Sequence, residues 1–273
     1  MIKLAKEIGL DENLVRRLSS LTEQEKKKAE KCTEKCLSGN FGCLVRKSHI
    51  VRLAVILCCA VKAREEYAEK GIADGIFLDT MNDIKIWCEN NGNKGLKNYG
   101  WIKNHVQCEL FRLGRLQFQL YECRNRTLLY NKLPFSYGER LIYVHIPQGE
   151  GLEREKCIES LKTAEVFFAE HFPDYKYRYY FTESWLLADC NRDFMAEDSN
   201  IIKFASLFEH CYSVKIDAQA IERVFGKRRF FVKSYPEHTS LQKRLKRYML
   251  GGAKPGIGVA VIDRDSFVCA KMM

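Results

Sequence analysis

The stretch YVHIPQGEGLEREKC, residues 143–157, joins an apolar run to a helical pattern. The apolar run, residues 141–146, ends at Pro147, and Gly149 and Gly151 follow with one residue between them. Apolar side chains then recur at helical spacing through residues 153–171, which predicts an amphipathic helix. The stretch therefore predicts a strand, a turn and a helix. The turn is either an ordinary link or a cradle for a phosphate group.

The periodicity changes on both sides of this stretch. Upstream, RLQFQLY at residues 115–121 alternates polar and apolar side chains, which predicts a strand with one buried face. Residues 127–133 are a weaker strand candidate, and residues 177–181 predict the strand after the helix. Further strands are expected near Val214 and Phe231 and at residues 258–262, and further helices at residues 186–194, 199–210 and 240–250.

The first 110 residues predict helices alone. Thr22 and Glu25 have capping-box spacing at the start of a charged helix that extends to about residue 37. Further helices are expected between Ser48 and Gly71 and at residues 79–89 and 99–111. We therefore expect an α+β chain with two domains: an all-helical domain at residues 1–112, and a mixed β-sheet domain flanked by helices at residues 113–273.

The composition is that of an ordinary globular protein, with 273 residues, 46% hydrophobic and 29% charged. The N-terminus is charged and carries no signal-peptide pattern, and the longest apolar run, residues 53–61, is too short to cross a bilayer. We expect a soluble, cytoplasmic protein with no membrane partner. The formal net charge of +10 permits nucleic acid, anionic membranes or phosphorylated small molecules as partners and selects none of them.

The 12 cysteines are scattered singly, which favours reduced, buried thiols over a disulfide framework. Cys32, Cys36, Cys43 and His49 offer zinc-ligand chemistry, but their spacing matches no common zinc-finger pattern. We therefore expect no metal site.

Several stretches together resemble a family of bacterial N-acyltransferase-like proteins, in which a helical N-acyltransferase N-terminal domain precedes a GNAT-like C-terminal domain. The resemblance covers nearly the whole chain. It is carried by DIKIW (83–87), GLKNYGWI (95–102), LFRLGRLQF (110–118), VHIPQG (144–149), FFAEHFP (167–173), SWLL (184–187), DSNI (198–201), TSLQ (239–242) and the pair Gly251-Gly252.

This resemblance implies a GNAT-type sheet in which acyl-coenzyme A (acyl-CoA) inserts between two splayed strands, with its pyrophosphate at the start of the intervening helix. A helix N-terminus offers unpaired N–H donors and partial positive charge, and glycine allows close backbone approach. The cofactor-binding candidates are Ile146, Gln148, Gly149, Glu150, Gly151 and Leu152. Two features favour the alternative of a simple turn: Gln148 directly precedes Gly149, which shortens the usual GNAT spacing, and Glu150, Glu153 and Glu155 bring negative charge.

The resemblance implies a site that works mainly by positioning, with a carboxylate or a water chain as base and a tyrosine or water as acid. Glu183, just after the strand at residues 177–181, is the first candidate for the base, and its alternative is a solvent-facing loop carboxylate. His145 lies next to the expected thioester, with a core histidine as its alternative. Tyr179, or its neighbour Tyr180, is the candidate phenol.

Three functions are compatible with these residues. The leading one is an acyl-CoA-dependent N-acyltransferase that uses acetyl-CoA or another acyl-CoA and a small-molecule or peptide amine. The second is a non-catalytic GNAT-like protein that binds a ligand or a partner. The third, nucleic-acid binding through the basic residues 243–247, ranks last because the chain shows neither a stacking-aromatic motif nor zinc-finger spacing. Residues 226–229 and 243–247 are also candidates for the ribose phosphate of CoA, or they form solvated faces.

Overall fold

The computed structural model describes residues 1–125 and 133–269, and the chain divides into two compact units. The first unit comprises Met1–Gln119, Ile146–Gln148 and Thr163–Pro173, and the second comprises Leu120–His145, Gly149–Lys162 and Asp174–Met273. Two short segments from the later part of the chain thus belong with the N-terminal helices. The domain boundary near residue 112 stays a prediction.

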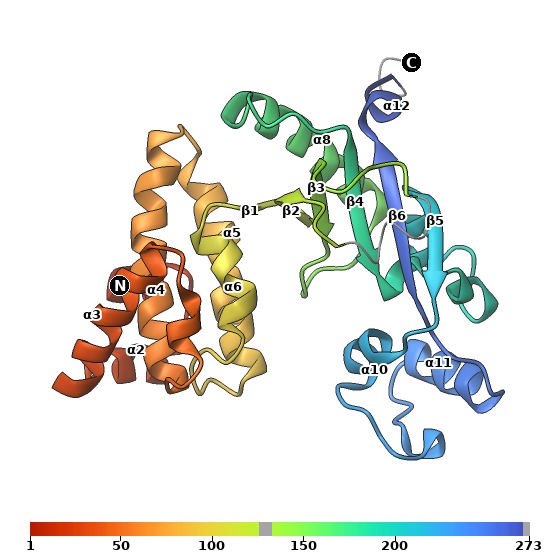
Figure 1. Ribbon diagram of the computed structural model, residues 1–273. Helices are drawn as coiled ribbons and strands as arrows, with labels where there is room; N and C mark the ends of the chain where they lie inside the picture. The colour runs from red at the N-terminus through yellow and green to blue at the C-terminus, as the bar shows by residue number, and fades with distance from the viewer. Residues whose placement is uncertain (126–132, 270–273) are drawn as a thin grey trace. The chain divides into compact units, whose positions relative to one another are not determined.

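The first unit is built mainly from helices (Figure 1). They are α1 (Ile2–Glu7), α2 (Glu12–Ser19), α3 (Glu23–Leu37), the 3-10 helix η1 (Phe41–Leu44), α4 (His49–Glu69), α5 (Asp74–Asn90) and α6 (Tyr99–Val106). The Thr22 side chain accepts a hydrogen bond from the Glu25 backbone and completes the predicted capping box. The apolar run at residues 53–61 makes α4 the most buried helix of this unit.

The first unit differs from the prediction at the end of its last helix. Residues 110–111 were expected to be helical, but Leu110–Leu113 is strand β1 and pairs antiparallel with β2 (Leu116–Glu122). Gly114, with φ of +73°, adopts the left-handed conformation that a tight hairpin turn requires. Periodicity alone does not separate a short apolar strand from a buried helical turn, because both are continuous apolar runs.

The sheet has six strands in the order β1-β2-β3-β4-β6-β5. Strand β3 (Arg140–His145) runs parallel to β4 (Tyr179–Ser184), and α8 (Arg154–His171) is the crossover helix between them. Strand β6 (Ile257–Asp263) pairs antiparallel with both β4 and β5 (Glu209–Val214). The predicted α+β class, with a helical N-terminal region and a mixed sheet flanked by helices, is confirmed.

The remaining elements lie in the second unit (Figure 1). They are the 3-10 turns η2 (Trp185–Leu187), η3 (Asp189–Asp193) and η4 (Val232–Ser234), and the helices α9 (Asn200–Ala205), α10 (Ala218–Phe225), α11 (Ser240–Leu250) and α12 (Arg264–Cys269). Helices α10 and α11 pack around a second core that contains Trp185, Ile221 and Leu245.

Three further predictions need correction. Residues 186–194 form 3-10 turns rather than a helix, and α9 ends at Ala205 because residues 209–210 enter β5. The strand expected near Phe231 is wrong, because Phe231 is exposed and begins the turn η4. Apart from Leu133, the weaker strand candidate at residues 127–133 lies outside the described residues. In residues 1–125 and 133–269, no helix is both long and apolar enough to cross a membrane.

Candidate active site

Two of the three predicted catalytic residues come together where β3 and β4 end. Parallel strands end at the same edge of a sheet, and these two pair at Ile142 with Tyr180 and at Tyr143 with Phe181. Both strands continue beyond this register, to His145 and Ser184. Since side chains two residues apart share one face, Tyr143 and His145 on β3 lie on the same face as Phe181 and Glu183 on β4. The structure thus corrects the placement of Glu183, which is part of β4 and does not follow the strand.

Four aromatic rings surround this position, and we call them the aromatic cluster: Tyr121, Tyr143, His145 and Phe181. The rings of Tyr143 and His145 stack with centroids 4.1 Å apart. Tyr143 meets Phe181 edge-on at 4.9 Å and Tyr121 at 5.4 Å. The cluster continues the apolar core on this face of the sheet, so its rings are held by packing on several sides.

The Glu183 carboxyl is half-buried beside this cluster. Burial raises its pKa above the ordinary value of 4.5, because removing water disfavours the charged form. Burial, and then the charge of Glu183, also raise the pKa of the Tyr143 phenol. The pKa of the Tyr121 phenol is also raised, by burial and then by the charges of Cys123 and Glu183. The site therefore sets a carboxylate suited to accepting a proton next to phenols that stay protonated at neutral pH.

Tyr179 is placed apart from these residues. It starts β4, four positions before Glu183, which is about 13 Å along a strand. Its ring packs against Phe135, and the Arg178 guanidinium lies over it at 5.1 Å. Tyr143 and Tyr121 are the phenols that the structure brings to Glu183. The signal that identifies Tyr143 is its position two residues before His145 on the same strand.

The predicted cradle has two halves, residues 146–148 and residues 149–152, and the second half leads directly into α8. Gly149 is exposed with φ of +123°, and a β-carbon there would meet nothing within 4 Å. Leu152 is buried and anchors the turn. The backbone carbonyl of Glu153 accepts the first helical hydrogen bond, from Cys157 N at 3.1 Å. The Glu153 carboxylate pairs with Lys156 Nζ at 3.0 Å, which offsets one of the three negative charges that opposed an anion site.

The first half of the cradle belongs to the first unit. The Gln148 amide exchanges hydrogen bonds with the Asn90 amide at 3.0 and 3.4 Å. The Pro147 carbonyl accepts a 3.1 Å hydrogen bond from Arg115, whose side chain is buried. Ile146–Gln148 is therefore held by groups of its own unit. Asn90 and Arg115 are positioning residues that sequence reasoning missed, since nothing in their local pattern points to residues 147–148.

The residues of the second half fit a phosphorylated ligand. Gly149 leaves the backbone open, the start of α8 supplies backbone N–H donors, and the partly exposed Arg154 adds positive charge to that turn. A diphosphate fits this set of donors.

The described residues hold no metal centre. No group of three His, Cys, Asp or Glu side chains in residues 1–125 and 133–269 is arranged to bind a metal ion. The cysteine side chains that the structure describes, from Cys32 to Cys211, are free thiols, with Cys36 and Cys43 sulfurs 3.7 Å apart.

A parallel β3–α8–β4 crossover with a glycine turn before α8 is the arrangement expected of a GNAT-type acyltransferase. The family comparison agrees. Residues 110–262 match the GNAT-like C-terminal domain, and residues 1–108 match the N-acyltransferase N-terminal domain. The chain belongs to the family of acyltransferases that combine these two domains.

Solved structures share this fold over nearly the whole chain. An acyltransferase in complex with decanoyl-CoA and teicoplanin has a TM-score of 0.77 and 21% sequence identity, with 96% of this chain and 86% of that chain covered. An acyltransferase in complex with decanoyl-CoA has a TM-score of 0.79 at 20% identity and the same coverage. A comparison with curated protein sequences finds no match.

Proposed function

We propose that this protein is an acyl-CoA-dependent N-acyltransferase that transfers an acyl group to an amine of a small molecule or peptide. One observation carries the proposal: the half-buried Glu183 carboxyl faces the aromatic cluster where β3 and β4 end, and the glycine turn and α8 follow β3 directly. Family membership and the acyl-CoA in the solved structures of the same fold support it.

In this proposal Gly149–Leu152 and the first turn of α8 hold the diphosphate of the donor. The N–H groups of the helix start and the positive charge of Arg154 bind the phosphate oxygens. When bound, acyl-CoA supplies an acyl group activated as a thioester. The acyl end is assigned to the edge of the sheet where the pairing of β3 with β4 stops, after Tyr143 and Phe181.

Residues of the chain then transfer two protons, one from the acceptor nitrogen and one to the thioester sulfur. Glu183 accepts a proton from the acceptor nitrogen, whose lone pair attacks the acyl carbon to form the C–N bond. Tyr143 or Tyr121, each protonated at neutral pH, donates a proton to the sulfur as the C–S bond breaks, and the proton held by Glu183 then returns to the phenolate. His145, stacked on Tyr143, holds that ring in place and lines the acyl end of the site.

The donor in this proposal is a medium-chain acyl-CoA. The support comes from the solved structures, which contain octanoyl-CoA and decanoyl-CoA. An amine of a small molecule or peptide is proposed as the acceptor because one of these structures contains teicoplanin.

The first experiment is calorimetric titration with CoA, acetyl-CoA, octanoyl-CoA and decanoyl-CoA. The parent should bind all four, and a Gly149→Asp, Gly151→Asp double variant should bind at least tenfold more weakly, because two carboxylates then face the phosphates. Gly138→Asp is the matched control, since Gly138 also has a positive φ and open space for a β-carbon. Circular dichroism confirms that each variant is folded.

The second experiment measures turnover with a panel of primary amines. CoA release is followed by chromatography, because the 12 cysteines of the chain would react with a thiol reagent. Binding without turnover would leave the acceptor open. A folded parent that binds none of the four ligands would overturn the proposal and favour a GNAT-like binding protein without this donor.

A further inference from the structure

The segment Gly226–Leu250 carries most of the excess positive charge of the chain. It contains eight lysines and arginines and one glutamate, which gives it a formal charge of +7 within a chain total of +10. We call it the basic segment; it runs from the end of α10 through η4 to the end of α11. This concentration of positive charge does not by itself identify a ligand.

Large apolar side chains are exposed within the same segment. Phe230 is 92% exposed, Phe231 67% and Leu250 50%. The two phenylalanine rings meet edge-on, with centroids 4.7 Å apart. A nearly fully exposed phenylalanine leaves a large apolar area in water, and clustered exposure of this kind marks an interaction surface.

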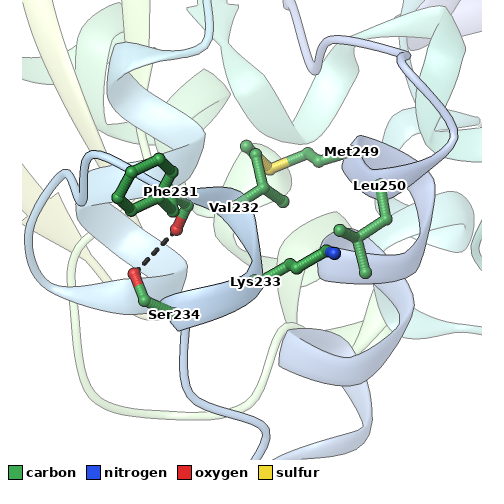
Figure 2. Close-up of a pocket in the computed structure, with 6 residues that line it drawn as sticks. All are labelled: Phe231, Val232, Lys233, Ser234, Met249 and Leu250. Carbon is green, nitrogen blue, oxygen red and sulfur yellow. Dashed lines mark hydrogen bonds between the residues drawn. The ribbon is translucent and has the colours of Figure 1, made fainter.

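This apolar surface includes a shallow, open depression between η4 and the end of α11 (Figure 2). Its lining is Phe231, Val232, Lys233, Ser234, Met249 and Leu250. The Ser234 hydroxyl donates a 2.7 Å hydrogen bond to the Phe231 carbonyl, which holds the turn that presents the rings (Figure 2). Lys233 lies beside Leu250, so a cation borders the apolar surface directly (Figure 2).

Not every charge of the basic segment is available to a partner. Arg228 pairs with Asp217, and Lys246 pairs with Glu237 at 2.7 Å. Lys227, Arg229 and Lys233 are exposed and have no ion-pair partner among residues 1–125 and 133–269. These three cations flank Phe230 and Phe231 in the sequence, so the free positive charge and the exposed rings occupy one short turn.

We propose that Phe230, Phe231 and Leu250, together with Lys227, Arg229 and Lys233, form a docking surface for an anionic lipid bilayer. This replaces the expectation of no membrane partner, which concerned only a segment that crosses the bilayer. We call these six residues the docking patch. Exposed aromatic and aliphatic side chains enter the interfacial region of a bilayer, while flanking cations attract anionic headgroups. The positive charge complements the negative charge of the lipid headgroups. Insertion into the bilayer also explains why large apolar side chains are exposed beside these cations, which charge alone does not explain.

A nucleic acid explains the same residues less well. Aromatic rings can stack on bases beside basic side chains. However, the apolar surface continues over the aliphatic side chains of Val232, Met249 and Leu250, and aliphatic side chains do not stack on bases. The edge-on packing of Phe230 and Phe231 also departs from the open, parallel faces that successive bases need. The docking role is separate from the proposed acyl transfer and does not depend on it.

The test is co-sedimentation of the full chain with vesicles of phosphatidylcholine alone and of phosphatidylcholine with about 30% phosphatidylglycerol, which approximates the anionic content of a charged leaflet. Binding to the anionic vesicles should exceed binding to the neutral ones by about tenfold or more at 0.1 M salt and should weaken at 0.5 M salt. Phe230→Ser, Phe231→Ser should reduce binding to anionic vesicles by about tenfold or more without changing the net charge.

Charge is tested by Lys227→Glu, Arg229→Glu, Lys233→Glu, which should abolish the binding. The matched control is Lys27→Glu, Lys28→Glu, Lys31→Glu on α3, which changes the net charge equally and should leave most of the binding intact. Leu37→Ser is the control for removing an exposed apolar side chain elsewhere.

Two results would overturn the proposal. One is equal loss of vesicle binding in both charge-reversal variants, which would mean that net charge alone drives it. The other is absence of vesicle binding together with binding of a 30-nucleotide DNA, roughly two OB-fold site sizes, that depends on the docking patch. That second result would identify the surface as a nucleic-acid site.

Discussion

Replacing Glu183 with glutamine separates proton transfer from binding at the candidate active site. Glutamine keeps the size of the side chain and its hydrogen-bonding capacity but cannot accept a proton. Glu183 is half-buried on β4 beside the aromatic cluster, so the substitution leaves packing nearly unchanged. The variant therefore tests the chemical role that the position assigns to this carboxyl.

A positioned general base contributes about 10²–10⁴-fold to the rate, or about 3–5 kcal/mol of transition-state stabilisation. We expect kcat/KM of Glu183→Gln to fall by that factor while the Kd for acyl-CoA stays within about twofold, because the diphosphate is assigned to α8 and not to β4. Burial raises the pKa of Glu183 above 4.5, so the acid limb of the parent pH–rate profile should lie above the range of an exposed carboxyl. The variant should lack this limb.

The same substitution, Glu183→Gln, should lower activity but raise the stability of the folded chain at pH 7. A carboxyl whose pKa is higher in the folded chain than in the unfolded chain binds its proton more tightly when folded. Its favourable contribution is fully present below the unfolded pKa near 4.5 and is lost as pH rises through the folded value. Glu183→Gln should therefore be more stable than the parent at pH 7 and no more stable at pH 4.

The assay combines chromatographic detection of CoA with urea denaturation at both pH values. Glu209→Gln, an exposed glutamate on β5 of the same sheet, is the control and should change neither property. A loss of activity below about threefold would refute the assignment of Glu183 as the base, since it would fall far short of general-base catalysis. An equal loss of acyl-CoA binding would instead assign the residue to the donor site.

Three predictions concern the fold. Asp83→Asn should destabilise the chain by about 1.5–3 kcal/mol in urea, because the buried Asp83 carboxylate accepts hydrogen bonds from His105 and Trp101 at 3.0 Å and a neutral amide accepts them more weakly. Burial opposes ionisation of Asp83, but these partners hold its pKa below 3.8, so its contribution is present above that pH and is lost on acidification. A change below about 0.5 kcal/mol would contradict this account. Phe111→Ala should lower the free energy of unfolding by about 3–5 kcal/mol, because its buried ring packs on Tyr67, Phe167 and Phe172. Phe230→Ala, at an exposed ring, should be nearly neutral. Similar losses in both variants would show that burial does not decide the cost. Gly258→Ala should destabilise the second unit by several kcal/mol, about the cost of overpacking or more, because a β-carbon there would lie 2.0 Å from the Leu187 carbonyl oxygen; retention of parental stability would show that β6 moves aside.

Local elements with strong periodicity were predictable from the sequence. The capping box at Thr22, the helix of α8 and the alternation that gives β2 are confirmed, since each depends on neighbours within a few residues. Short apolar runs were not. Leu110–Leu113 became a strand because Leu116–Glu122 pairs with it, and Phe231 was not recruited to the sheet. Strand formation depends on pairing with a second segment, which the propensity of one short run does not contain.

The sequence by itself determined the family, the strand–turn–helix order around residues 143–157, and the candidacy of His145 and Glu183. Only the tertiary structure decided which side chains accompany them. Tyr143 and Tyr121 are near Glu183 while Tyr179 is about 13 Å along the strand, because strand direction and register select the residues that share one edge and one face of a sheet. It likewise decided that Gln148 pairs with Asn90, 58 positions earlier in the chain. Such contacts form when the folded backbone brings distant residues together, so no local sequence pattern encodes them.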